Sequence, residues 1–198
     1  LKALAFILVI AFSVYFAIDI IQDKQNIMSF EDYDPPSSLI VEGEEIKRAK
    51  YPFVDVHSHQ WGMPTMDLNE LVSEMDEINM KFLVNLSGSG FGPQVAKDLY
   101  FNESIKNIKE NQPERIGLFV NVDFNSIDVK NHVENQVKII RDAVSKGAIG
   151  LKVYKYLGLT NKDSKGERVR VDDERLKPIW EVCGELNIPV LIHSADPF

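Results

Sequence analysis

Short apolar runs alternate with amphipathic stretches from Tyr51 to the end of the chain. The apolar runs predict five strands, at residues 53–56, 82–86, 116–120, 149–153 and 189–192. Apolar residues at helical spacing predict helices over residues 68–78, 95–108, 129–144 and about 173–186. Strict alternation of strands and helices is typical of a parallel sheet with right-handed crossovers. The pattern alone fits either an open doubly wound sheet or a (β/α)8 barrel.

The spacing of these units favours the barrel. Eight βα units of this size match a TIM barrel of about 250 residues with insertions, whereas the fifth predicted strand ends shortly before Phe198. We therefore expect an α/β fold in which residues 51–198 form the first five strands of an incomplete TIM (β/α)8 barrel. A complete open-sheet protein is the less favoured alternative, because its last strand would have no following helix to cover it.

An almost continuous apolar run near the amino terminus predicts a membrane segment. About 20 apolar residues span a bilayer, and the apolar part of a cleaved signal is usually about 7–15 residues long. Residues 1–21 are therefore predicted to form a transmembrane helix, with a cleaved signal as the alternative. Lys2 precedes the run and Asp19 and Asp23 follow it, which favours a membrane-anchored domain on the exported, periplasmic or extracellular side.

Residues 22–50 are polar and show no sustained helical or strand period. Asp34-Pro35-Pro36 interrupts any regular element in this stretch. We expect a linker here. An arm packed across the bottom of the barrel is the alternative, since residues 39–41 could add a short strand.

Composition narrows the range of partners and metal ligands. The net charge of -8 argues against a nucleic-acid groove, which needs clustered Lys and Arg, so a small molecule is the expected partner. The single cysteine, Cys183, excludes a cluster of thiolates within the chain. Any metal would therefore be bound mainly by nitrogen and oxygen ligands.

Three of the four histidines fall at the carboxyl ends of predicted strands. His57 and His59 follow the first strand, and alternation places both on the same face as Asp55. His193 follows the fifth strand. Because parallel strands end on one rim, where barrels carry their active sites, these imidazoles are expected to converge on one metal ion. His132 is expected to be a solvated helix residue.

Lys152 lies in the fourth strand, within Gly150-Leu151-Lys152-Val153-Tyr154. Alternation points it away from the helices, and a lysine inside a barrel is costly unless it is paired or chemically used. Two readings stay open: Lys152 is a ligand or catalytic residue, or it reaches water at the rim and orients an anionic substrate.

These features together resemble the amidohydrolase superfamily, in its branch of amidohydrolase-related proteins, over residues 51–198. The resemblance rests on Asp55-Val56-His57-Ser58-His59, on Lys152 and on the stretch 189–197. It implies that His57, His59 and His193 bind a divalent metal such as zinc. It also implies either a carboxylated Lys152 that bridges two metals or a single ion bound without it. The superfamily's sixth-strand histidine and eighth-strand aspartate would lie beyond Phe198, so the metal count and the catalytic base stay open.

The expected chemistry is metal-dependent hydrolysis of a carbonyl-type substrate such as an amide, ester or lactone. A bound metal lowers the pKa of water to about 7, which supplies hydroxide at neutral pH. A related branch of the superfamily uses the same ligands for decarboxylation, and a non-catalytic binding domain displayed on the membrane is a further alternative. We expect the 198-residue chain alone to be inactive, because an unclosed barrel leaves strand edges unpaired.

Overall fold

A computed structural model describes residues 33–36, 46–90 and 93–193. The chain divides between Glu45 and Ile46 into two units, and all the elements below belong to the second. The strands are β1 (Phe53–Ser58), β2 (Met80–Asn85), β3 (Ile116–Val120), β4 (Gly150–Val153) and β5 (Val190–Ile192). The helices are α2 (Leu68–Glu77), α3 (Gln94–Asn111), α4 (His132–Lys146), α5 (Tyr156–Leu159), the 3-10 helix η1 (Glu174–Leu176) and α6 (Lys177–Glu185).

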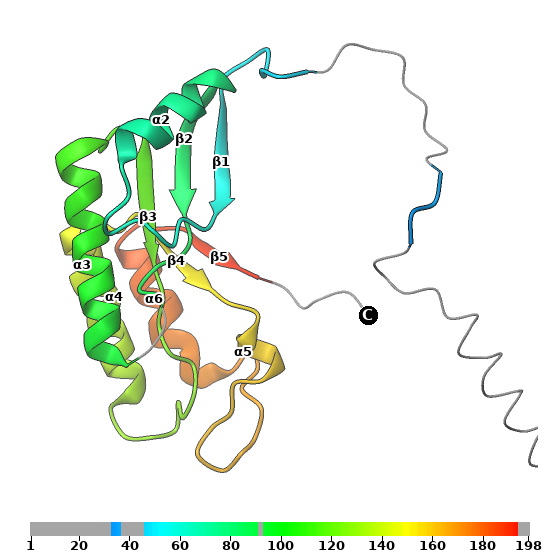
Figure 1. Cartoon of the computed structure of the whole chain (residues 1–198). Helices are drawn as coiled ribbons and strands as arrows, with labels where there is room; N and C mark the ends of the chain where they lie inside the picture. Colours follow the sequence, from blue (N-terminus) through cyan, green and yellow to red (C-terminus); the bar gives the residue numbers. More distant parts are fainter. Residues whose placement is uncertain (1–32, 37–45, 91–92, 194–198) are drawn as a thin grey trace, which may run out of the picture. The chain divides into compact units, whose positions relative to one another are not determined.

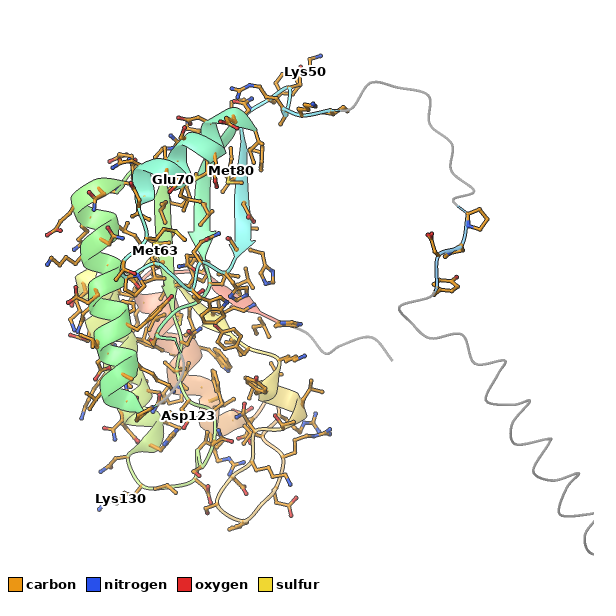
Figure 2. The ribbon with its side chains drawn as sticks, viewed as in Figure 1. Lys50, Met63, Glu70, Met80, Asp123 and Lys130 are labelled. Atoms are coloured by element: carbon orange, nitrogen blue, oxygen red, sulfur yellow. The ribbon has the colours of Figure 1, made fainter. Side chains whose placement is uncertain are left out.

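The five strands form one parallel sheet in the order β1-β2-β3-β4-β5. The prediction of five parallel strands is thus confirmed, and the sheet has the form of half a barrel. Figure 1 shows α2, α3, α4 and α6 gathered along one side of it. In Figure 2, Lys50 and Met80 mark the end where β1 and β2 begin, and Asp123, which follows β3, lies toward the opposite end of this unit. The carboxyl ends of the strands therefore share one rim.

Two apolar clusters pack on opposite faces of this sheet. The larger lies between the sheet and the helices and includes Leu118, Val120, Leu151 and Val153, all nearly fully buried. The smaller joins Val84, Leu86 and Phe119 on the other face, since side chains alternate along a strand. A continuous apolar run is typical of a strand buried on both faces, as β3 is.

The edge strand β1 is far less covered than the central strands. Val54 is 50% exposed and Val56 is 56% exposed, whereas all four residues of β4 are buried. Ile192, on β5 at the other edge, is also exposed. The described half-barrel therefore has a well-packed centre and two apolar edges.

The helix termini follow the expected capping chemistry. The side chain of Asp67 accepts hydrogen bonds from the backbone N–H groups of Asn69 and Glu70 at the start of α2. Asp173 caps η1, the first turn leading into α6. Gly147 ends α4 with a φ of 118°, a left-handed conformation that favours glycine.

The predicted amino-terminal membrane helix needs correction. In the part of the chain that the structure describes, no helix is both long and apolar enough to cross a bilayer. Residues 1–21, for which the helix was predicted, lie outside that part. This finding does not support the predicted fold with a preceding transmembrane helix. It likewise does not support the membrane-anchored, exported localisation that was inferred from that helix. Most of the predicted linker, residues 22–50, also lies outside the described residues.

Candidate functional site

The three predicted strand-end histidines lie together at the rim. His57 is the penultimate residue of strand β1. His59 follows that strand, and His193 follows β5. The ring centroids of His57 and His59 are 5.6 Å apart, and those of His57 and His193 are 6.4 Å apart. The backbone N–H of His193 donates to the carbonyl oxygen of Val153 at 2.9 Å, which fixes His193 beside the end of β4. The curvature of the sheet therefore brings its two edges together at the histidines.

The expectation that His57, His59 and His193 form a metal-binding group needs correction. Within residues 33–36, 46–90 and 93–193, no group of three or more His, Cys, Asp and Glu side chains is arranged closely enough to hold a metal ion. Asp55, on the same strand as His57, accepts a hydrogen bond at 2.9 Å from the backbone N–H of His57. The structure thus brings three imidazoles near one another without a closed coordination shell.

Lys152 is buried directly below this rim. Its side chain is only 1% exposed, so it does not reach water at the rim, which was one of the two readings of its sequence. Its Nζ lies 5.8 Å from the ring centroid of Tyr154 and has no hydrogen-bond partner among the described residues. Burial lowers the pKa of Lys152, because desolvation penalises the ammonium. The neutral amine is therefore favoured relative to an exposed lysine.

The electrostatics around the first two histidines also favour their neutral forms. Burial, and then the nearby Lys152 and His193, lower the pKa of His57, although Asp55 acts to raise it. Burial, followed by His57 and Lys152, lowers the pKa of His59. Neutral imidazole is the form that binds a metal ion.

Two buried nitrogen atoms at this site lack partners. Nδ1 of His59 and Nζ of Lys152 have no hydrogen-bond partner within the described residues. Buried polar atoms are almost always paired, so such orphaned donors and acceptors need an explanation. The imidazoles of His57, His59 and His193 are nitrogen donors of the kind that a divalent cation accepts, and imidazole is a common ligand of zinc. The residues present therefore fit a cation, although the ligand set is incomplete.

Two aromatic residues that the sequence analysis did not assign to the site contact His59. The ring of Trp61 stacks on His59 with centroids 5.4 Å apart and an interplanar angle of 9°. The ring of Tyr154 stacks on His59 at 6.1 Å and 21°. Burial, together with Tyr100 and Tyr156, raises the pKa of Tyr154 to about 12, so its hydroxyl stays protonated at neutral pH. The spacing of Trp61, two residues after His59, was the available signal in the sequence.

Two asparagines at strand ends tie the rim together. The Oδ1 atom of Asn85 accepts from the backbone N–H groups of Gln60 and Ser87, and its Nδ2 donates to the carbonyl oxygen of Gln60. Asn121 accepts from the backbone N–H of Ser89 at 3.0 Å and donates to the carbonyl oxygen of Lys152 at 3.1 Å. The side-chain amide of Asn85 thus joins the segments after β1 and β2, and that of Asn121 joins the segment after β2 to β4. A polar residue ending each of two buried strands was the sequence signal for them.

The fourth histidine and the cysteine lie outside the site. His132 is the first residue of α4, and its Nε2 lies 3.0 Å from the carbonyl oxygen of Asp123. His132 therefore has a structural contact and is not simply solvated. Cys183 is buried in the helix-facing core, and burial raises the pKa of its thiol to about 11. Neither residue contributes to the rim.

Comparison with known proteins adds no family assignment to this geometry. The chain matches no protein-family model and no curated protein. Its function must therefore be argued from the site.

Proposed function

We propose that the half-barrel is the amino-terminal part of a metal-dependent hydrolase of the amidohydrolase type, acting on a carbonyl-type substrate. The observation that supports this most is the meeting of imidazoles from opposite edges of the sheet, at 5.6 Å and 6.4 Å between ring centroids. The buried, unpartnered Nζ of Lys152 below the same rim adds to it.

His57, His59 and His193 would hold the divalent cation in this proposal. Such a cation would supply Lewis acidity, which lowers the pKa of water and so provides hydroxide to attack a carbonyl carbon at neutral pH. The desolvated Nζ of Lys152 keeps N–H groups even as a neutral amine, and one of them can donate a hydrogen bond to the substrate's carbonyl oxygen as negative charge develops there. The protonated hydroxyl of Tyr154 donates to the carbonyl oxygen of Leu86 at 3.0 Å and so serves to hold the ring in place.

A cavity beside Tyr154 offers room for a small molecule. It has a volume of about 200 Å³ and opens among the segments that follow β2, β3 and β4. Its lining mixes polar residues, including Lys97, Asn121, Asp123 and Asn161, with apolar ones, including Val122 and Phe124. Tyr154, which also lines the cavity, contacts His59, which supports a small substrate that reaches from the cavity to the histidines.

Elemental analysis of the purified full-length protein tests the proposal. We expect stoichiometric zinc or another divalent metal, and loss of that metal in a His57→Ala/His59→Ala double variant. The matched control is His132→Ala, which removes a histidine outside the rim and should leave the metal content unchanged. A metal content that does not differ between the double variant and the wild type would contradict the proposal.

A further inference from the structure

Two aromatic rings stack on the imidazole of His59. Trp61 lies nearly parallel to the imidazole, and Tyr154 lies within 21° of parallel. His57, in contrast, meets His59 edge-on, at an interplanar angle of 62°. His59 therefore has two stacked aromatic rings against it.

This stacking replaces the contact that usually orients such a histidine. A metal-binding histidine normally donates its second ring N–H to a carboxylate, a carbonyl or water, and that hydrogen bond fixes the ring plane. Within the described residues, Nδ1 of His59 has no hydrogen-bond partner. Stacked rings favour near-parallel planes, so two such contacts can select one orientation of the His59 ring.

The segment that carries Trp61 is itself held on both sides. On one side, the backbone N–H of Gln60 donates to Asn85, and the hydroxyl of Tyr100 donates to the carbonyl oxygen of Gln60 at 3.2 Å. On the other side, Met63 is fully buried, and Nδ2 of Asn107 donates to its carbonyl oxygen at 2.8 Å. Trp61 thus projects from a fixed turn, although its own side chain is exposed.

Tyr154 is fixed in a different way. Its hydroxyl donates to the carbonyl oxygen of Leu86, which follows β2, while its backbone follows β4. The ring therefore bridges two strand ends beside His59. Its position does not depend on Trp61.

We infer that Trp61 and Tyr154 are positioning residues that hold the imidazole of His59 in the plane required to bind a divalent cation, in place of a hydrogen bond at Nδ1. This inference rests on the proposed function. Removal of one outer-shell partner of a metal ligand typically weakens metal affinity by about 10–100-fold. Loss of the Trp61 ring should therefore weaken the affinity by about tenfold.

Titration of the metal-free full-length protein with Co²⁺ tests the inference through the visible absorption of the bound ion. The variants are Trp61→Ala, which removes the ring, and Trp61→Phe, which keeps an aromatic ring at that position. The matched control is Trp180→Phe, because Trp180 stacks on Phe124 in the helical layer, away from the histidines. We expect weaker binding and a changed Co²⁺ spectrum in Trp61→Ala, with most of the affinity restored in Trp61→Phe and no change in Trp180→Phe.

A second pair of variants guards against misfolding as an explanation. Tyr154→Phe keeps the stacked ring and removes the hydroxyl, and Tyr154→Leu removes the ring. We expect near-normal Co²⁺ affinity in the first and weakened affinity in the second, with unchanged circular dichroism in both. Normal affinity and spectra in Trp61→Ala and Tyr154→Leu would overturn the inference and leave the proposed function intact. Failure of the wild-type protein to bind Co²⁺ would instead overturn both.

Discussion

The ring centroids of His57 and His193 lie 6.4 Å apart, although His57 is in the edge strand β1 and His193 follows β5 at the other edge of the sheet. A flat five-stranded sheet would separate its edges by about four strand spacings of roughly 4.8 Å each. Curvature of the half-barrel removes that separation at the rim. Residues distant in the sequence thus become neighbours at the position where barrels carry their active sites.

Replacing Lys152 with Met should stabilise the protein while removing activity. Lys152 is buried and its Nζ has no hydrogen-bond partner among the described residues, and such an unsatisfied group costs about 1–3 kcal/mol. We expect the free energy of unfolding, measured in urea at pH 7, to rise by about 1–3 kcal/mol. The exposed Lys138 provides the control, Lys138→Met, which should change stability by less than about 0.5 kcal/mol. A large loss of stability in Lys152→Met would show that the amine has a partner.

The difference in unfolding free energy between the wild type and Lys152→Met should depend on pH. Burial lowers the pKa of Lys152 below its ordinary value of 10.5 in the folded protein. Between the lowered pKa and 10.5, the unfolded chain binds more protons than the folded one, so the wild type gains stability as the pH rises through this window. The advantage of Lys152→Met should therefore shrink as the pH approaches 10.5. A difference that stays constant from pH 7 to pH 10.5 would argue against a depressed pKa.

Gly88→Ala should damage the rim. Gly88 has a φ of 59°, and an added Cβ would lie 1.6 Å from Oδ1 of Asn121, the residue that holds Ser89 and Lys152. We expect destabilisation by more than about 1 kcal/mol in chemical denaturation, because both the backbone and the space are unsuited to alanine.

Gly166→Ala is the matched control for this substitution. Gly166 also has a positive φ, of 83°, but nothing lies within 4 Å of its added Cβ. This variant should show the backbone strain alone. Equal losses in the two variants would mean that Asn121 moves aside without cost.

The bounds of the central strand β3 could be predicted from the sequence, whereas the buried face of helix α3 was predicted less well. β3 has the predicted bounds, because a strand buried on both faces leaves an uninterrupted apolar run. The predicted apolar face of the second helix was partly wrong: Val95 is 81% exposed and Leu99 is 62% exposed. The buried residues of α3 are Phe101, Ser104, Ile105 and Ile108, nearer its carboxyl end. Periodicity shows which residues share a face, but it does not show how far a helix extends beyond the sheet.

The candidate site was predictable only as far as strand ends could be found. His57, His59 and His193 could be placed on one rim because parallel strands end together, and Lys152 could be assigned to the interior by alternation. The stacking of Trp61 and Tyr154 on His59 depends on the turn after β1, whose conformation is fixed by Asn85 and other distant residues. The short helix α5 was also missed, since Leu157 and Gly158 within it have non-helical backbone angles.

Asp163→Asn should weaken the loop after β4 at neutral pH. The nearly buried carboxylate of Asp163 accepts hydrogen bonds from Arg175 and from the backbone N–H groups of Lys165 and Glu167. Although burial acts to raise the pKa of Asp163, these hydrogen bonds lower it below its ordinary value of 3.8. A depressed folded pKa contributes stability above pH 3.8, and that contribution is lost as the pH falls through the folded value.

The difference in unfolding free energy between wild type and Asp163→Asn should therefore disappear in acid. The control is Asp172→Asn, which breaks the exposed pair with Arg170 and should have little effect at any pH, because surface ion pairs contribute little. Urea denaturation between pH 3 and pH 7 measures both. A difference that persists unchanged at pH 3 would contradict the role assigned to Asp163.

The central claim is that His57, His59 and His193 bind one cation, and anomalous X-ray scattering at the zinc edge from crystals of the full-length protein tests it most directly. The account predicts one anomalous peak about 2.0–2.1 Å from a nitrogen atom of each of the three imidazoles. A zinc-loaded crystal with no peak at this rim, or with His193 turned away from the other two rings, would contradict it.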